Sequence, residues 1–438
     1  MGKDLTTLTS AIFLASSLAA CGGGGGSGGT GGDVGGGTAP TISALSFSPN
    51  VAYVDTGGGE LIVIGTLDYA DPDGDIESLT ILARDETGQI TDDITTPIEG
   101  VAGSTSGTIE GELVADTSIA GTYTVQVHVT DSKNHTSNQL EDTFRIAEFP
   151  WVARQPMLLP RRDFATATLD GRIYVIGGGD VMAGGVPAPP TTTVEVYDPE
   201  TDSWTFATPM LRAVTNHAAV ALDGKIYVIG GQEEFLPMSN AVQEYDPVTQ
   251  LWTPRASMPT AREAAAAAAF DGRIFVMGGT SGGMDIATVE AYDPATDSWA
   301  SLPPLAEPRR DLAAEVVGGK LLALGGHTGS YVLDAGYRRV VEVYDPVGNA
   351  WSRAADMPLP RADFASVVVA TELIIAGGGN WARGLSDVSS LDPASGNWRM
   401  RTAMPTELAW PRGESVGGRL YVFDTEVTYE YTPNNDIL

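Results

Sequence analysis

The chain contains very little cysteine and little positive charge for its 438 residues. A single cysteine excludes an intrachain disulfide and a metal site built from several thiolates. Lys and Arg number 25 against 56 Asp and Glu, so the formal net charge is −31. An acidic surface of that size repels nucleic acid and anionic lipid headgroups, which excludes a nucleic-acid partner. No apolar run beyond the N-terminus is long enough for a transmembrane helix.

The one cysteine, Cys21, lies just after a short apolar stretch and ends the segment Leu-Ala-Ala-Cys. This segment resembles the lipobox of bacterial lipoproteins, in which a signal peptidase cleaves before a cysteine that carries diacylglycerol. The resemblance implies a signal peptide over residues 1–20 and a lipid anchor on Cys21. It also implies a location outside the cytoplasm, at the outer membrane or cell surface of a Gram-negative bacterium. The alternative is a soluble protein with a chance Ala-Ala-Cys near its start.

Two segments separate this cysteine from the repeats. Residues 21–40 consist of the lipidated cysteine and a glycine-rich stretch, and this composition predicts a flexible tether. Residues 41–148 predict an all-β domain, because strand-like runs alternate with turn clusters and residues 122–129 alternate with period two. Its length, strand spacing and closing GTYTVQVHVTDSKNHTS resemble bacterial immunoglobulin-like or cadherin-like modules.

A cluster of carboxylates lies in a turn of this second segment. Asp71, Asp73 and Asp75 form the sequence DPDGD. Ca²⁺ prefers six to eight oxygen ligands, so these side chains are candidate Ca²⁺ ligands. The alternative is a polar turn between strands, since the glycine spacing departs from the EF-hand loop. No other cofactor is expected.

Residues 150–438 contain an internal repeat. A diglycine recurs about every 50 residues, from Gly177-Gly178 to Gly377-Gly378, and a Tyr-Asp-Pro and a Trp follow it in most copies. This order of residues at this period resembles the kelch repeat. The resemblance implies a β-propeller in which every repeat supplies one four-stranded blade. The repeated Tyr and Trp are expected to pack blade against blade and to have no chemical role.

The repeats predict six blades and a closed ring. The sixth repeat ends before its fourth strand, while residues 151–157, beginning at Trp151, match the fourth strand that begins at Trp204 in the first repeat. A strand at 151–157 would therefore complete the last blade and join the ends of the ring. The fold class that we predict is all-β, with a six-bladed kelch β-propeller preceded by an immunoglobulin-like β-sandwich.

The loops between strands of the same repeat point to one face for binding. We call the four strands of a repeat a, b, c and d, in chain order. The loops between strands b and c, and the loops between strand d and strand a of the next repeat, lie together on that face. These d–a and b–c loops vary in sequence, as binding loops on a rigid scaffold do. An arginine recurs in four d–a loops: Arg161, Arg262, Arg309 and Arg361. One interpretation is a consensus arginine that pairs with a neighbouring aspartate around the pore mouth. The other is a ring of guanidinium groups that binds carboxylates or sugar hydroxyls.

Charged and aromatic residues that break the repeat pattern are the candidate ligand-binding residues. They are Arg162, His217, Glu263, Arg310, His327, Trp381, Arg383, Trp410, Arg412 and Glu414. Trp410 with Arg412 and Glu414 at the pore rim would suit a sugar ring stacked on an aromatic side chain. The alternative is a tryptophan that covers the exposed edge of blade six.

Three functions remain open on the sequence alone. The first is a surface-anchored binding or adhesion lipoprotein that engages a protein or glycan with its loop face and the membrane only through its lipid. The second is a sugar-converting enzyme that resembles the sialic acid mutarotases among kelch proteins, with Arg412 and Glu414 as acid–base groups and no motif that assigns them. The third is a structural scaffold of the cell envelope. Copper oxidases of the galactose oxidase type are excluded, because they require a tyrosine cross-linked to a cysteine. The only cysteine of this chain, Cys21, is assigned to the lipid.

Overall fold

The computed structural model describes residues 10–12, 37–48, 51–53, 60–98, 101, 103–116, 120–181, 187–234, 238–329, 336–380 and 383–436. The chain divides into two compact units, and the boundary between them along the chain lies between Phe149 and Pro150. Within the described ranges, no helix is both long and apolar enough to cross a bilayer. Cys21 and most of the predicted signal peptide and tether lie outside the described residues.

The first unit consists of two β-sheets. One sheet has the strand order β1-β7-β4-β2 and contains β1 (Ser10–Ile12), β2 (Thr41–Ser48), β4 (Glu60–Ala70) and β7 (Ser106–Asp116). The other has the order β3-β9-β8-β5-β6 and contains β3 (Val51–Tyr53), β5 (Ile76–Arg84), β6 (Ile90–Pro97), β8 (Gly121–Asp131) and β9 (Leu140–Ala147). All strand pairs are antiparallel except β3 with β9.

One apolar core holds these two sheets together. Val63 and Leu67 from β4 and Val125 and Val127 from β8 belong to the same buried cluster. Alternate residues of β8 are buried, as the period-two pattern of its sequence predicts. The unit is therefore a two-sheet sandwich, and its immunoglobulin-like topology stays a prediction.

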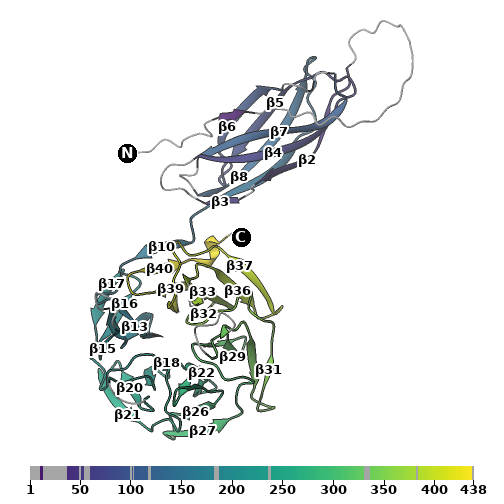
Figure 1. Ribbon diagram of the computed structural model, residues 1–438. Helices are drawn as coiled ribbons and strands as arrows, with labels where there is room; N and C mark the ends of the chain where they lie inside the picture. Colours follow the sequence, from purple (N-terminus) through teal and green to yellow (C-terminus); the bar gives the residue numbers. More distant parts are fainter. Residues whose placement is uncertain are drawn as a thin grey trace. The chain divides into compact units, whose positions relative to one another are not determined.

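The second unit is a β-propeller whose six blades are each a four-stranded antiparallel sheet in the described residues (Figure 1). Blade 1 contains β12 (Ala165–Leu169), β13 (Arg172–Ile176), β16 (Val194–Asp198) and β17 (Ser203–Phe206). Blade 2 contains β18 (Ala218–Leu222), β19 (Lys225–Ile229), β20 (Val242–Asp246) and β21 (Leu251–Arg255). Blade 3 contains β22 (Ala266–Phe270), β23 (Arg273–Met277), β26 (Val289–Asp293) and β27 (Ser298–Leu302).

Blade 4 contains β28 (Ala313–Val317), β29 (Lys320–Leu324), β30 (Val341–Asp345) and β31 (Ala350–Arg353). Blade 5 contains β32 (Ala365–Val369), β33 (Glu372–Ala376), β36 (Val388–Asp392) and β37 (Asn397–Arg401). Blade 6 contains β38 (Arg412–Val416), β39 (Arg419–Phe423), β40 (Thr428–Tyr431) and β10 (Trp151–Arg154). A 3₁₀ turn, η2 (Pro433–Asn435), follows the last strand.

The ring closes inside blade 6. Strand β10 pairs antiparallel with β40, and Trp151 lies opposite Tyr431. The indole of Trp151 donates from Nε1 to the backbone oxygen of Thr402 at 3.0 Å and packs at a tilt of 38° against Tyr431, with the ring centroids 4.6 Å apart. The first strand of the propeller thus completes the blade begun by the last three, so blade 6 has the same four strands and the same short outer edge as the other blades.

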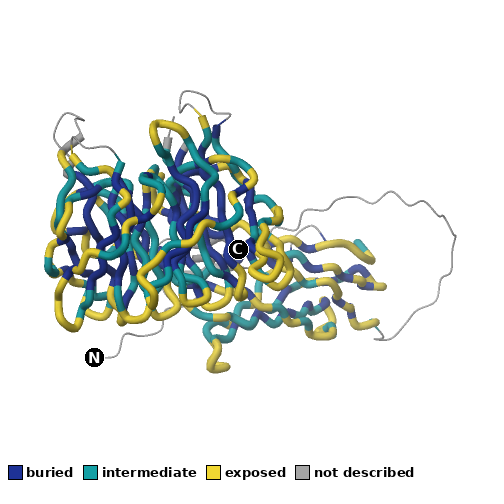
Figure 2. The backbone as a smooth tube through the Cα atoms, turned by 90° about the horizontal axis from the view of Figure 1, so that it is seen from below, coloured by how far each residue is buried: buried dark blue, intermediate teal, exposed yellow. Residues whose placement is uncertain are grey.

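Each blade follows from the alternation of tight turns and apolar strands. In blade 1, Asp170 and Gly171 adopt positive φ, which makes the hairpin between the first two strands. The second strand of every blade is buried almost throughout, as in β13, because neighbouring blades cover both of its faces. Figure 2 shows this burial along the strands and exposure at the turns.

Tryptophans fasten each blade to the one before it. The indole Nε1 of Trp204 donates to the backbone oxygen of Gln155 at 2.9 Å, and that of Trp252 donates to Thr208 at 2.9 Å. The remaining repeats make the same bond, through Trp299, Trp351 and Trp398. The repeated aromatic side chains are therefore structural, as the sequence predicts.

The d–a and b–c loops meet at one end of the propeller. Three b–c loops contain short strands, namely β14 (Gly179–Val181) with β15 (Pro187–Pro190), β24 (Thr280–Ser281) with β25 (Met284–Asp285), and β34 (Gly379–Asn380) with β35 (Arg383–Gly384). In blade 1 the d–a loop adds β11 (Arg161–Arg162), which pairs with β14. The diglycine allows this approach: a Cβ on Gly279 would lie 2.5 Å from the backbone oxygen of Glu263.

Candidate functional site

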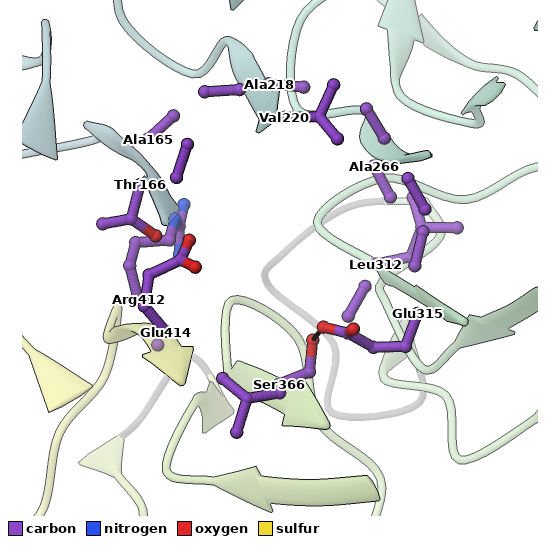
Figure 3. Close-up of a pocket in the computed structure, with 18 of the residues that line it drawn as sticks. Ala165, Thr166, Ala218, Val220, Ala266, Leu312, Glu315, Ser366, Arg412 and Glu414 are labelled. Carbon is purple, nitrogen blue, oxygen red and sulfur yellow. Dashed lines mark hydrogen bonds between the residues drawn. The ribbon is translucent and has the colours of Figure 1, made fainter. Parts of the chain in front are cut away.

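The innermost strands of the six blades surround a central cavity of about 430 Å³. These strands are β12, β18, β22, β28, β32 and β38, and each contacts the next around the ring. Side chains from all six line the cavity (Figure 3). A space of this volume is in the range of small-ligand sites.

A ring of equivalent residues forms the mouth of this cavity at the end where the d–a loops arrive. Five blades place a residue with φ between 50° and 56° just before the innermost strand: Asp163, Asn216, Ala264, Asp311 and Asp363. In the last four of these residues, Asn216 to Asp363, the backbone N–H donates to the backbone oxygen of the equivalent mouth residue in the preceding blade, at 2.8 to 3.0 Å. Asp and Asn tolerate this left-handed conformation better than most residues. The mouth is therefore rigid and lined with carboxylates.

Arg412 neutralises part of this acidic mouth. Its Nη2 donates to Oδ1 of Asp363 at 3.3 Å, and its Nη1 donates to the backbone oxygen of Pro411 at 3.2 Å. Burial raises the pKa of Asp363, and the guanidinium of Arg412 opposes that rise. Arg412 is the one Lys or Arg among the described residues that line the cavity.

Two glutamates face the cavity deeper inside. Glu315 and Glu414 occupy the same position, the third residue, of β28 and β38. Each accepts a hydrogen bond from a hydroxyl on the innermost strand of the following blade: Ser366 Oγ donates to Glu315 at 2.7 Å, and Thr168 Oγ1 donates to Glu414 at 2.7 Å. Figure 3 shows the two carboxyl groups on different sides of the cavity.

Both of these glutamates hold their protons more tightly than free carboxyl groups do. Burial raises the pKa of Glu315 to about 8, and the nearby charge of Glu414 adds to the rise while the bond from Ser366 opposes it. Burial also raises the pKa of Glu414, against the bonds from Thr168 and Thr166. The cavity thus contains two buried acids whose pKa values are raised, and the charge of Glu414 acts on Glu315.

The wall of the cavity has a polar half and an apolar half. Blades 4, 5, 6 and 1 contribute its polar side chains, namely Glu315, Ser366, Arg412, Glu414, Ser415, Thr166 and Thr168. Within their innermost strands, blades 2 and 3 contribute only alanine and valine, from residues 218–221 and 266–269. Asn216 and His217, just before the strand of blade 2, are the polar residues on this side. A ligand that fits this wall has one polar end and one apolar side.

The two histidines singled out in the propeller are buried. His217 is 7% exposed and forms part of the cavity wall, and burial lowers its pKa to about 3, so it is neutral at physiological pH. His327 is fully buried, and its ring packs edge-on against Tyr337 with the ring centroids 4.7 Å apart. His217 is therefore not a protonated acid at neutral pH.

Three further candidates lie around the mouth. Arg162 Nε is 3.9 Å from Oδ2 of the mouth residue Asp163. Arg310 forms an ion pair with Asp285 and lies 3.5 Å from Asp311. Burial raises the pKa of Glu263, which is hydrogen-bonded to Asn216.

Of Trp381, Arg383 and Trp410, only Trp410 has a side chain that the structure describes. Trp410 stands where the other blades have their mouth residue, but it is 51% exposed and does not belong to the cavity lining of Arg412 and Glu414. Trp381 lies outside the described residues, and of Arg383 only the backbone, in β35, is described.

The recurring arginines differ from the expected pairing around the pore mouth. Arg161, Arg262 and Arg309 are buried inside their blades and pair with a glutamate on the third strand, not with the neighbouring aspartate. The ion pairs are Arg161 with Glu195 at 3.0 Å, Arg262 with Glu290 at 2.7 Å and Arg309 with Glu342 at 2.8 Å. In blades 1 and 4 the aspartate two residues later, Asp163 or Asp311, belongs to the mouth ring, and blade 3 has Ala264 at that position. These guanidinium groups are structural.

The candidate residues predicted from the sequence did not include Glu315, an acid of the cavity wall. Glu315 is the only charged residue in the innermost strands of blades 1 to 5. A comparison of the first strands across repeats would have found it, because every other residue there is apolar or carries a hydroxyl. Asp311 and Asp363 were visible in the d–a repeats but looked like partners of the arginines.

The acidic turn of the first unit is held by its own backbone. Asp71 is fully buried and accepts from the N–H groups of Asp73, Asp75 and Ile76 at 2.7 to 3.2 Å. Lys133 lies 3.6 Å from Asp73 and 3.5 Å from Asp75. In the described ranges no three His, Cys, Asp or Glu side chains form a group that could hold a metal ion. Ca²⁺ binding at this turn stays a prediction.

The fold and the repeat geometry define a kelch-type β-propeller. The chain belongs to the KLHDC2/KLHL20/DRC7 Kelch-repeats domain family, which matches residues 164–308 and 216–425.

Individual relatives match over shorter stretches. Kelch-like protein 25 of Xenopus laevis is 39% identical over 84 residues, or 18% of this chain and 14% of that protein. The F-box/kelch-repeat protein At1g67480 of Arabidopsis thaliana is 39% identical over 85 residues, or 19% of this chain and 21% of that protein. The chain thus spans a small part of the length of these relatives. The solved structure of YjhT is 17% identical, with a TM-score of 0.48 over 64% of this chain and 94% of YjhT.

Proposed function

We propose that this protein is a binding protein whose propeller takes up a protein or glycan ligand at the cavity mouth. The observation that carries the proposal is the convergence, at one end of the propeller, of the variable loops and a ligand-sized cavity. Kelch-repeat proteins generally bind protein partners, which supports the same reading. A cavity of this size also argues against a scaffold with a featureless face.

We also propose that Cys21 anchors the protein by a lipid outside the cytoplasm, at the outer membrane or cell surface of a Gram-negative bacterium. The lipobox-like segment and the glycine-rich stretch after it support this proposal. Metabolic labelling with a radioactive fatty acid tests it. The wild type is expected to take up label and enter the detergent phase, and Cys21→Ser is expected to do neither. Equal labelling of the two proteins would refute the anchor.

Ligand binding is tested with protein and glycan arrays probed by the purified chain. Arg412→Glu reverses the charge of the only basic side chain of the described lining, so it is expected to change the affinity for an array ligand at least about tenfold. The control is Arg172→Glu, at the opposite end of blade 1, where the guanidinium is 59% exposed. Binding that is reduced equally by both variants would show that the ligand contacts another face.

A second candidate is an enzyme that opens and closes a sugar ring by acid–base catalysis. The observation in its favour is that Glu315 and Glu414 share one cavity and interact electrostatically. Proton-exchange NMR of anomer interconversion tests it, with sialic and hexuronic acids and with neutral hexoses. Turnover that is lost in Glu414→Gln but kept in Arg172→Glu would favour the enzyme over the binding protein.

A further inference from the structure

We propose that the central cavity binds an ammonium group at the end of an apolar chain, with the ammonium between Glu315 and Glu414. The ammonium could come from a lysine side chain of a partner protein or from a free alkylamine. This inference rests on the proposed binding function and names the chemistry of the group that enters the cavity.

The first reason is the charge that the cavity leaves uncompensated. Glu414 is close enough for its charge to act on Glu315, and each of the two carboxyl groups is held in place by a hydroxyl from the next blade. The only basic side chain of the described lining, Arg412, donates instead to Asp363 at the mouth. A cation between the two carboxylates would remove their mutual repulsion, and a neutral or anionic group would not.

The second reason is the shape of the chemical surface. The polar side chains lie on four consecutive blades, while the strands of blades 2 and 3 offer only alanine and valine over residues 218–221 and 266–269. This apolar side suits methylene groups. Figure 3 shows Glu414 across the cavity from Ala266, while Glu315 extends into the cavity from the blade next to Ala266. The side chain of lysine has this division, with four methylenes and a compact ammonium.

The third reason is access. Asp311 and Asp363 of the mouth ring stand along the route into the cavity, beside Arg310 and Arg412. Each aspartate offsets the charge of its arginine, so the mouth does not repel a cation. The net charge of −31 favours the approach of a cation over that of an anion.

Binding of the ammonium would release protons. The glutamates must ionise to pair with it, whereas an alkylamine resembles lysine and stays charged to about pH 10. Because burial raises the pKa of Glu315 to about 8, affinity is expected to increase as the pH rises from 6 to 9. Asp363, Asp311 and Arg412 also face this space, and none of them compensates both glutamates.

Calorimetric titration of the full chain with n-hexylamine tests the proposal. We expect saturable binding that is at least about tenfold tighter at pH 9 than at pH 6, with proton release seen as a dependence on buffer ionisation enthalpy. Glu315→Gln and Glu414→Gln are each expected to weaken it at least about tenfold. Glu200→Gln, an exposed residue of a turn, makes the same charge change and is expected to have no effect. Hexan-1-ol and hexanoate serve as neutral and anionic probes of the same length.

Equal binding of hexan-1-ol and hexylamine, or unchanged hexylamine binding in both Gln variants, would overturn the inference. A second arm compares a lysine peptide with its norleucine counterpart, which separates a protein source of the ammonium from a free amine. If Arg412→Glu abolishes binding of an array ligand while both Gln variants retain it, the proposed function stands and only the inference fails. If no array ligand binds but hexylamine does, the cavity site stands without the larger ligand.

Discussion

At the residue scale, the buried arginines show how the blades tolerate charge in their interiors. Three of them pair with a glutamate on the third strand, but Arg361 of blade 5 faces Ser389 at the equivalent position. Arg361 donates to the backbone oxygens of Gly377 and Asp387 at 2.8 and 3.2 Å, and burial lowers its pKa to about 10. The charge of Asp387 opposes this lowering only in part, and a buried guanidinium without a glutamate at the third-strand position lowers the stability of the fold.

Ser389→Glu is therefore expected to stabilise the propeller, by about 1–2 kcal/mol, because it supplies the missing carboxylate. Glu195→Ser makes the opposite change in blade 1 and is expected to cost about 3–5 kcal/mol, since Arg161 stays buried. Chemical denaturation of both variants measures the difference. A loss of stability in Ser389→Glu would mean that blade 5 has no room for the longer side chain.

Glu315 gives a pH-dependent stability whose sign follows from its raised pKa. Between its unfolded value near 4.5 and its folded value of about 8, the folded chain binds more protons than the unfolded chain, so this group lowers stability as the pH rises. Glu315→Gln removes the effect. The variant is expected to melt roughly 2–5 °C above the wild type at pH 8.5 and to match it at pH 4.5. A constant difference at both pH values would contradict the assignment.

At the scale of single elements, the strand β10 decides whether the ring is closed. Trp151 is buried, packs against the ring of Tyr431 and donates to Thr402, so it joins blade 6 to blade 5. The match between the strands at Trp151 and Trp204 was visible in the sequence. The short rim strands, such as β14 and β24, were not, because two or three residues carry no periodic pattern.

Trp151→Ala is expected to lower the free energy of unfolding of the propeller by about 3–5 kcal/mol. The reason is that it removes a buried ring where β10 pairs with β40, the contact that closes the ring of blades. Val152→Ala, on the same strand but 42% exposed, is the control and is expected to cost little. Tryptophan-independent far-UV circular dichroism in denaturant measures both. A cost below about 1 kcal/mol for Trp151→Ala would show that closure contributes little.

At the scale of the whole molecule, the chain has two separate apolar cores. The first unit has one buried cluster, and the clusters of the propeller draw only on residues from Trp151 onward. Two independent cores predict two unfolding transitions in calorimetry. Residues 150–438 expressed alone are expected to keep the propeller transition within about 3 °C. A single transition that is lost when the first unit is removed would show that the units fold together.

The sequence by itself determined the propeller. The diglycine, tyrosine and tryptophan recur because each repeat must make the same turns and the same contacts with its neighbours, so local rules were enough to predict six blades. Arg412 and Glu414 were singled out for breaking that pattern, and both line the cavity.

Only the tertiary structure decided which groups face each other across the ring. Glu315 and Glu414 lie two blades apart, and nothing in either local sequence reveals that the innermost strands bring their charges together. The same holds for Arg161, whose partner Glu195 comes from another strand of the blade and not from the adjacent Asp163. Charge interactions depend on distance in space, and in a closed ring that distance is set by the neighbouring blades and not by the separation along the chain.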